Sequence, residues 1–147
     1  MFLVEDILKT KGKEVYTATP EMPIQEALQI MADRNLGALV VIEGEQVVGI
    51  FSERDLARRI IGKDACSLAT KVKQIMTSPV TTVSPTNSIE ECMELMTDKH
   101  IRHLPVIEDN RLVGVISIGD VVKGILTNRE ALIDQLKDYI SGSGYGR

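Results

Sequence analysis

The chain carries an internal repeat. Shifting the sequence by 65 positions aligns residues 17–60 on residues 82–125 without a gap, and 15 of the 44 aligned positions are identical. Chance matching at average composition would give about three identities. Because 147 residues are too few for two independent domains of ordinary size, the two copies must bury their apolar faces against each other. We therefore expect two equivalent units that share one core.

The first part of each copy has the pattern of an amphipathic helix. Apolar residues recur at the three- and four-residue spacing of one helix face in both copies: Ile24, Ala27, Leu28 and Met31, and then Ile89, Cys92, Met93 and Met96. Thr19 and Ser84 each precede a proline, so we predict them as helix N-caps with the proline at the first helical position. Each helix is expected to end near Asn35 or His100.

Short runs of β-branched residues follow each of these helices. They predict two strands in each copy, at 38–42 and 47–51 and at 104–107 and 112–116. The polar stretches between them, 43–46 and 108–111, are typical of hairpin loops. A short strand before the first helix is predicted at 15–17 and 80–83. A second helix is predicted to start at Ser52 or Ser117 and to continue through 56–61 or 121–126. The fold class is therefore α/β, with the order βαββα in each copy.

Composition and charge exclude several classes of protein. Aromatic residues make up only 3% of the chain, so the core must be aliphatic. The net charge is -4 with both signs interspersed, which argues against a surface for nucleic acid or anionic lipid. No run of 18 apolar residues is present, and the first residues include acids, so we expect a cytoplasmic protein without a membrane span.

The cysteines and histidines do not form a recognisable site. Cys66 and Cys92 are isolated, and neither belongs to a C-x-x-C pair, so we interpret both as bystander thiols. His100 and His103 have a spacing that would suit metal ligation on a helix. Since no third ligand of suitable spacing accompanies them, we predict no metal site.

The motif G-x-x-S-x-x-D occurs in both copies, at 49–55 and 114–120, where a strand leads into a helix. Glycine permits close backbone approach, the helix N-terminus offers free N–H groups to an anion, and the carboxylate suits the paired hydroxyls of a ribose. The alternative is an S-x-x-D capping box, which needs no ligand. The occurrence of the motif in two otherwise diverged copies favours the ligand.

With these motifs the repeated unit resembles the CBS (cystathionine beta-synthase) domain. The resemblance rests on the P-x-x-x-I-x-E-A/C segment, the LVVI or LPVI run and the VGI/V-x-S-x-x-D motif, and it covers about residues 4–126. It implies a tandem CBS-domain pair, two βαββα repeats with pseudo-twofold symmetry. Residues 4–20 and 72–85 resemble the lead-in strands of the family. We expect a first repeat at 1–65, a second at 66–127, and a C-terminal helix with a disordered tail at 128–147.

The resemblance also implies two clefts that bind adenosine-containing ligands. The first would combine residues of both copies: Ser52, Arg54, Asp55, Val80, Arg102 and His103. The second would combine their counterparts: Ser117, Asp120, Val15, Gly37 and Ala38. The two valines would address the adenine ring.

The repeat sets Arg102 and His103 opposite Gly37 and Ala38, so the clefts differ in charge. Cationic donors favour phosphate, and Arg54 with Arg58 adds to them. The first cleft is therefore expected to be the better nucleotide site. The second would hold an uncharged adenosine moiety or stay empty. The alternative for Arg102 and His103 is a solvated helix end, where basic residues complement the helix dipole.

The leading hypothesis is a regulatory, non-enzymatic sensor of adenine nucleotides, as in energy sensing. AMP ranks first among its ligands, with ATP, NAD(H) and S-adenosylmethionine as alternatives. Family pairs associate into dimers through their helices, so we expect a homodimer and a separate effector protein. Alternatives are a structural dimerisation module or a nucleotide-hydrolysing enzyme that uses Asp55, Asp120 and His103. For hydrolysis the sequence offers no phosphate loop and no nucleophile with its base.

The residues after the repeats form one more amphipathic pattern, at 129–140. Its apolar residues lie on one side of a predicted helix: Leu132, Ile133, Leu136, Tyr139 and Ile140. We expect this helix to dock on its own module or on a second copy.

Overall fold

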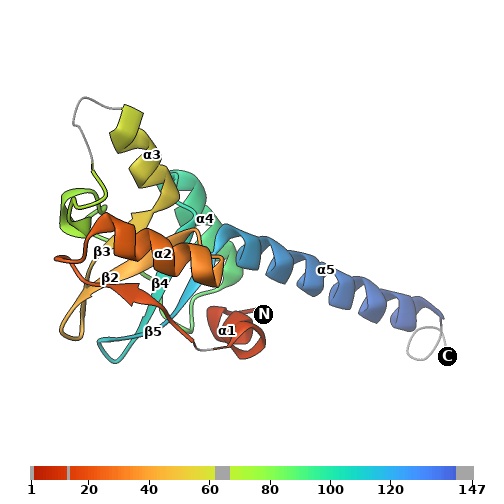
Figure 1. Cartoon of the computed structure of the whole chain (residues 1–147). Helices are drawn as coiled ribbons and strands as arrows, with labels where there is room; N and C mark the ends of the chain where they lie inside the picture. The colour runs from red at the N-terminus through yellow and green to blue at the C-terminus, as the bar shows by residue number, and fades with distance from the viewer. Residues whose placement is uncertain (1, 13, 62–66, 142–147) are drawn as a thin grey trace.

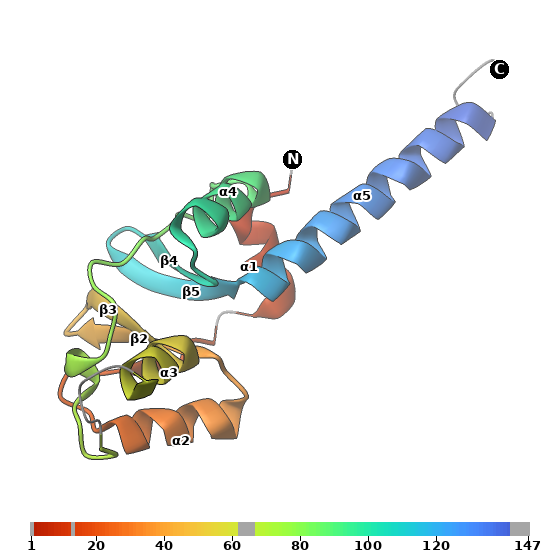
Figure 2. The same ribbon diagram turned by 90° about the horizontal axis from the view of Figure 1, so that it is seen from above.

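The computed structural model of the chain describes residues 2–12, 14–61 and 67–141. Two α/β halves lie side by side (Figures 1 and 2). The first repeat comprises β1 (Thr17–Ala18), α2 (Ile24–Arg34), β2 (Ala38–Glu43), β3 (Gln46–Ser52) and α3 (Glu53–Ile61). The second comprises α4 (Ile89–Lys99), β4 (His103–Glu108), β5 (Arg111–Ser117) and the first turns of α5 (Ile118–Ser141). The α/β class and the repeat of helix, hairpin and helix are as predicted.

The two hairpins have the same register. Ala38 pairs with Ser52 in the first, and His103 pairs with Ser117 in the second, so each partner lies 65 positions after its counterpart. The register shifts at the same place in both hairpins, after Val41 and after Val106. The loops are shorter than predicted, since β2 ends at 43 and β3 begins at 46. The left-handed backbone of Gly44, Asp109 and Asn110 allows these tight turns.

The predicted first strands are only partly formed. In the first repeat, β1 pairs in parallel with β2 and lies slightly later than the predicted 15–17. In the second repeat the predicted strand 80–83 is reduced to a single bridge between Val83 and Val106. The first sheet accordingly has three strands and the second has two among the described residues.

The first helix of each repeat begins four residues later than predicted. The N-caps are Pro23 and Ser88, whereas the predicted Thr19 and Ser84 belong to turns. In the second repeat the reason is local hydrogen bonding, whereas the cap at Pro23 makes no side-chain hydrogen bond. The Ser88 hydroxyl accepts from the Glu91 N–H, and the Glu91 carboxylate accepts from the Ser88 N–H, which together make a reciprocal capping box. The predicted helix ends are confirmed, with both C-caps in left-handed backbone.

Each repeat is completed by the segment that precedes the other one. We call residues 2–11 the first lead-in and residues 71–77 the second lead-in. The first is mainly a helix, α1 (Val4–Lys11), and the second holds a 3-10 turn, η1 (Val72–Gln74), so the predicted lead-in strands are wrong in these stretches. Figure 2 shows α1 beside α4 and α5 of the second repeat. The first N–H groups of the lead-ins donate to turn carbonyls of the opposite repeat: Val4 to Asn87, Glu5 to Pro85, Val72 to Met22 and Lys73 to Pro20.

The buried side chains form two clusters, where we expected one shared core. The first repeat buries Val72 and Ile75 of the second lead-in among its own apolar residues. The second repeat buries Val4, Ile7 and Leu8 of the first lead-in in the same way. An isolated repeat would expose this apolar surface, so each half depends on a segment that is distant in the sequence.

Glycine at the hairpins allows the lead-ins to pack closely. A Cβ atom on Gly114 would lie 2.6 Å from Cδ2 of Leu8, and a Cβ on Gly49 would collide with Met76. These two glycines are the first residue of each G-x-x-S-x-x-D motif. Their packing role explains why both copies retain glycine without invoking a ligand.

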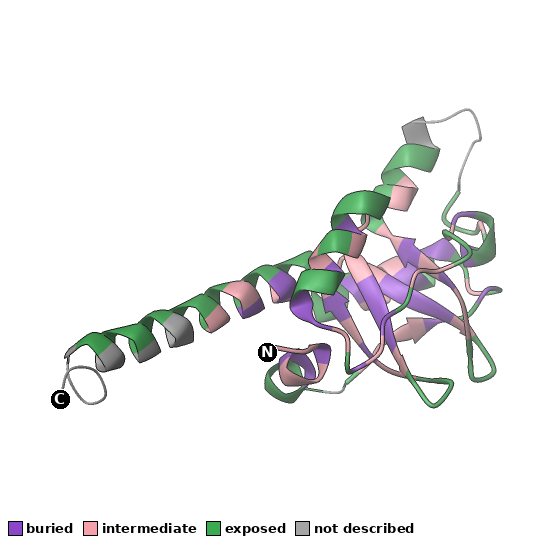
Figure 3. Cartoon of the chain, turned by 180° about the vertical axis from the view of Figure 1, so that it is seen from behind, coloured by how far each residue is buried: buried purple, intermediate pink, exposed green. Residues whose placement is uncertain are grey.

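The helix α5 is continuous over two stretches that were predicted as separate helices, the second helix of the second repeat and the C-terminal helix. No proline interrupts residues 118–141, so the helix continues straight and its C-terminal half projects from the module (Figures 1 and 3). Docking on its own module, one of the two predicted arrangements, is therefore not found. The side chains of Leu132 and Tyr139 and the predicted tail at 142–147 lie outside the described residues.

We predict that Leu8→Ala destabilises the second repeat. Leu8 is 5% exposed and packs there, so removing its side chain leaves a cavity that lowers the free energy of unfolding by about 2–4 kcal/mol. Urea denaturation measures the loss, and amide hydrogen exchange locates it in β4 and β5. Lys9→Ala, on the exposed side of the same helix, should change stability by less than about 0.5 kcal/mol. Loss of protection in β2 instead would contradict the exchanged packing.

Candidate functional site

The serine and aspartate of each G-x-x-S-x-x-D motif form a capping box at a helix start. In the first repeat, the Asp55 N–H donates to the Ser52 hydroxyl at 3.1 Å, and the Ser52 N–H donates to the Asp55 carboxylate at 3.2 Å. Ser117 and Asp120 make the same pair of bonds at 3.2 and 2.8 Å. The capping alternative is thus realised in both copies. It does not occupy every acceptor of the carboxylates, which leaves room for a ligand.

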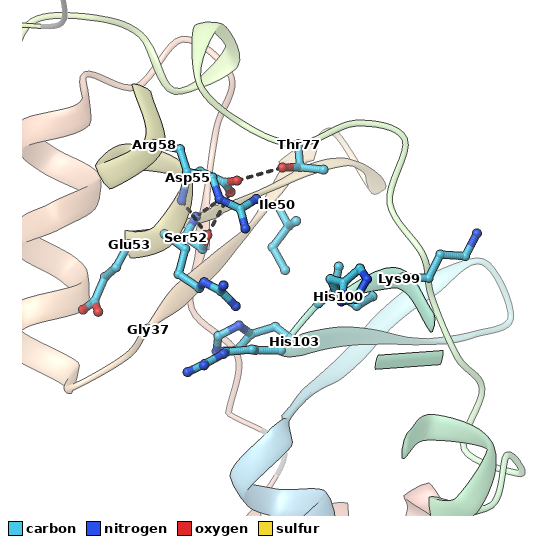
Figure 4. A pocket seen from close by; sticks show the side chains of 13 residues that line it. Gly37, Ile50, Ser52, Glu53, Asp55, Arg58, Thr77, Lys99, His100 and His103 are labelled. Carbon is cyan, nitrogen blue, oxygen red and sulfur yellow. Dashed lines mark hydrogen bonds between the residues drawn. The ribbon is translucent and has the colours of Figure 1, made fainter. Parts of the chain in front are cut away.

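Asp55 has a further neutral partner from the second lead-in. The Thr77 hydroxyl donates to Oδ1 of Asp55 at 3.0 Å, as Figure 4 shows. The backbone of Thr77 also exchanges two hydrogen bonds with Ile50, which fixes the lead-in along the edge of β3. A hydroxyl can rotate away or accept a bond from another donor, so Asp55 stays open to an exchange of partners.

A cavity of about 610 Å³ opens between the first motif and the end of α4. This volume lies within the range of small-ligand pockets, about 300–1,000 Å³. Five of the six residues predicted for the first cleft line it: Ser52, Arg54, Asp55, Arg102 and His103. Figure 4 shows Ser52, Asp55 and Thr77 on one wall, with His100 and His103 across the space. We call this cavity the first cleft.

The first cleft gathers positive charge. Four cationic side chains line it against two acidic ones, Glu53 and Asp55. The cations come from two elements: Arg54 and Arg58 on α3, and Lys99 and Arg102 at the end of α4 and just after it. All four are exposed, and none forms an ion pair with another described residue. The cleft therefore presents donors that a multiply charged anion can satisfy.

A smaller cavity of about 270 Å³ lies at the second motif, and we call it the second cleft. Four of its five predicted residues line it: Val15, Gly37, Ala38 and Ser117. The fifth, Asp120, does not line this space. Its carboxylate instead binds the ammonium of Lys11 at 2.7 Å, and both side chains border a neighbouring cavity of about 290 Å³.

Asp120 is held in its charged form. Partial burial by itself would raise the pKa of this carboxyl, but the Lys11 ammonium and the Ser117 N–H outweigh burial and lower the pKa below its usual value. The Lys11 ammonium also donates to the carbonyl oxygen of Val115 at 2.7 Å. Sequence comparison at 65 positions misses this contact, because it comes from the first lead-in rather than from the repeat.

His103 lies between the two clefts and lines both of them, as does Gly37. The imidazole packs on Gly37, where an added Cβ would lie 3.4 Å from Nε2. Burial lowers the pKa of His103, and the charges of Lys11 and Arg102 lower it further, against an opposing effect of Asp120. Any change of charge in either cleft acts on this ring.

In the first cleft one predicted lining residue is not found, and several residues were missed. Val80 is not among the residues that line the first cleft, and Thr77, three positions earlier, stands beside the motif because its backbone pairs with Ile50. Lys99 and His100 line the cleft through the end of α4. The sequence could have indicated them, because both stand within three residues of Arg102, which was predicted for the cleft.

The remaining sequence features do not form further sites in the described part of the chain. Cys92 is buried in the second cluster, and burial together with Glu91 and Glu90 raises the pKa of its thiol to about 11. Cys66 lies outside the described residues. Among those described, no three His, Cys, Asp or Glu side chains gather as a metal would require. None of the helices in the described residues has the length and apolar character to cross a membrane.

The geometry of two equivalent motifs facing opposite repeats agrees with the family comparison. The family model described as CBS domain matches twice, at residues 4–62 and 72–127. The chain belongs to the CBS domain family. A CBS domain-containing protein of Arabidopsis thaliana, CBSX3, mitochondrial, is 40% identical over 151 residues, which cover 97% of this chain and 73% of that protein.

Solved CBS structures share the fold. The CBS-domain containing protein ATU1752 from Agrobacterium tumefaciens has a TM-score of 0.78 and 42% identity, over 82% of this chain and 97% of that chain. The CBS domain pair of protein MJ0100, in complex with 5'-methylthioadenosine and S-adenosyl-L-methionine, has a TM-score of 0.72 and 27% identity, over 82% and 97% of the two chains. The predicted tandem CBS-domain pair is therefore confirmed, and adenosine ligands are bound by one of its structural neighbours.

We predict that His103 makes the CBS pair less stable in mild acid. The folded chain favours the neutral imidazole, so the unfolded chain binds more protons and the free energy of unfolding falls as the pH drops through 6.5, the ordinary pKa. Urea denaturation between about pH 7.5 and pH 5.5 measures this slope. The slope should be smaller in a His103→Gln variant. An equal slope in both proteins would contradict the prediction.

Proposed function

We propose that this CBS pair is a regulatory module that binds an anionic adenine nucleotide in the first cleft. The supporting observation is the set of four unpaired cations that line, together with Ser52 and Asp55, a cavity of about 610 Å³. A structural dimerisation module would not require such a concentration of like charge, which is unfavourable without an anion.

In this proposal Asp55 receives the ribose. Its Oδ1 atom accepts only from the Thr77 hydroxyl among the described residues, and a ribose hydroxyl can take that place without breaking the capping box. Ile50 and Ile101 supply apolar walls for the adenine ring. The predicted role of Val80 toward adenine has no support, since Val80 does not line the cleft.

The phosphate groups would lie among Arg54, Arg58, Lys99 and Arg102. Guanidinium groups bind phosphate oxygens in pairs, and a lysine ammonium adds a point charge. This charge favours AMP, ATP or NAD(H) over S-adenosylmethionine, whose sulfonium group is itself cationic. The cleft offers more cations than a single phosphate requires, so ATP is as well served as AMP, the ligand ranked first on sequence.

We propose no catalytic role for the site. Asp55 is engaged in the capping box, and among the described residues no hydrogen bond links His103 to a hydroxyl or thiol that would serve as nucleophile. Nucleotide binding would instead change the packing of the two repeats around His103 and Gly37, and an effector protein would respond to that change. The cytoplasmic location stays a prediction.

We also propose that α5 joins two copies of the module. Six of the seven large apolar residues exposed among those described lie on α5: Ile118, Val122, Leu126, Ile133, Leu136 and Ile140. Their spacing of three, four or seven residues places them on one face of the helix, over a length of about 33 Å. Exposed apolar stripes of this length favour association with a matching stripe.

The test of nucleotide binding compares AMP with adenosine by isothermal titration. An Arg102→Gln variant should bind AMP about tenfold more weakly, while its affinity for adenosine stays the same, because only the phosphate is affected. An Asp55→Asn variant should bind both ligands about 10–100-fold more weakly, because it loses the charged acceptor for the ribose.

Matched surface variants control for general effects. Arg59→Gln removes a cation from the exposed side of α3, and Asp33→Asn removes a carboxylate from the exposed side of α2. Neither residue lines the cleft, so both variants should bind AMP like the original chain. Absence of AMP and ATP binding at millimolar concentration would refute the proposal, as would an Arg102→Gln variant that weakens adenosine and AMP equally.

We predict that Leu136→Glu breaks the dimer. Leu136 is 54% exposed in the single chain, and a charge at this place would be buried by a second copy at considerable cost. Sedimentation velocity should show a dimer for the original chain and a monomer for the variant. Asp134→Lys alters the charge on the opposite side of α5 and should leave the dimer intact. A monomeric original chain would contradict the proposed role of α5.

A further inference from the structure

The second cleft is lined by a cation of the protein itself, and this cation binds the two residues whose counterparts line the first cleft. The Lys11 ammonium donates to Oδ2 of Asp120 and to the carbonyl oxygen of Val115, at 2.7 Å in both cases. By the shift of 65 positions, these two acceptors are the counterparts of Asp55 and Ile50. The two motifs therefore differ in which group stands beside the carboxylate.

The difference arises from the lead-ins. They correspond at a shift of 68 positions, at which Val4 matches Val72 and Ile7 matches Ile75 in the two clusters. In the second lead-in, the Thr77 backbone pairs with Ile50 and its neutral hydroxyl reaches Asp55. In the first lead-in, the longer Lys11 side chain reaches both acceptors, and it brings a charge.

The position of Lys11 is fixed by the packing of its helix. It is the last residue of α1, and Ile7 and Leu8 on the preceding turn are buried in the second repeat. A basic residue at a helix C-terminus is also favoured by the helix dipole. The ammonium is thus delivered to Asp120 by a segment that cannot move without exposing part of a core.

The second cleft is also too small for a nucleotide in this state. Its volume of about 270 Å³ is less than half that of the first cleft and falls below the usual range for small-ligand pockets. Lys11 is one of the residues that line it. Asp120 does not line it, and Lys11 lines both this cleft and the neighbouring cavity that Asp120 borders.

We propose that Lys11 closes the second cleft, so that each chain binds one nucleotide, in the first cleft. The inference rests on the proposed function of the first cleft. Displacing Lys11 would break a charge-assisted hydrogen bond to a partly buried carboxylate, whereas displacing the Thr77 hydroxyl from Asp55 breaks a neutral one. Lys11 therefore determines which of two otherwise equivalent motifs takes the ligand.

The experiment measures the stoichiometry of AMP and adenosine binding by isothermal titration. The original chain should bind one ligand per chain. Lys11→Met keeps most of the apolar stem and removes the charge, so it should bind a second ligand per chain, with adenosine affinity at the new site raised at least about tenfold. Lys11→Arg keeps a cation in place and should still bind one. Lys9→Met, on the same helix away from Asp120, is the matched control and should also bind one.

Adding Asp55→Asn distinguishes the two clefts. The Asp55→Asn chain should lose its strong site, and the double variant with Lys11→Met should recover one site, in the second cleft. If nothing binds to the original chain but Lys11→Met binds one ligand, the proposed function of the first cleft fails and the closure by Lys11 stands.

Three results would overturn the closure. Two ligands bound by the original chain would show that Lys11 yields to a nucleotide. A loss of AMP binding in Lys11→Met, with adenosine unchanged, would make Lys11 a phosphate contact. Binding of one ligand to Lys11→Met, with unchanged affinity and a thermal unfolding midpoint like that of Lys9→Met, would show that Lys11 does not limit access.

Discussion

The structure depends on the exchange of lead-ins between the two repeats. Val4, Ile7 and Leu8 fill the core of the second repeat, and Val72 and Ile75 fill that of the first. The first N–H groups of each lead-in find their acceptors in the proline-containing turn of the opposite repeat. Neither repeat can complete its core or satisfy these groups alone. The two halves are therefore tied together by burial, although their apolar residues form two clusters.

The same exchange makes the clefts unequal. Both motifs have the same capping box, and both hairpins have the same register, so the scaffold around each aspartate is equivalent. The lead-ins are not equivalent, and they end beside the aspartates. One places a threonine hydroxyl on Asp55, and the other places a lysine ammonium on Asp120. One side chain at the end of each lead-in thus makes the difference: Asp55 has a neutral partner, whereas Asp120 is bound to a charge.

The prediction from sequence succeeded where the signal was local or repeated. The hairpin strands and the ends of the first helix of each repeat follow from hydrophobic spacing and turn residues, which act over a few positions. It was wrong at the helix starts, because a proline after Thr19 or Ser84 suits a turn as well as a helix, and in the second repeat the Ser88–Glu91 capping box decided between them. Five of the six residues predicted for the first cleft line it, because the strand order brings Ser52 and Arg102 to the same side. Lys11 and Thr77 were missed, because both belong to the lead-ins, outside the aligned repeat or its motifs, and reach the aspartates only through tertiary packing.

The sequence by itself determined the α/β class, the duplication, the family and the greater positive charge of the first cleft, because these depend on residue order and on the comparison of two copies. Tertiary structure alone decided which segment completes which core, that Thr77 stands in place of Val80, and that Lys11 binds Asp120. Such contacts join residues that are distant in the sequence, as Lys11 and Asp120 are, 109 positions apart. No local spacing records them, since they arise only when burial brings distant segments together.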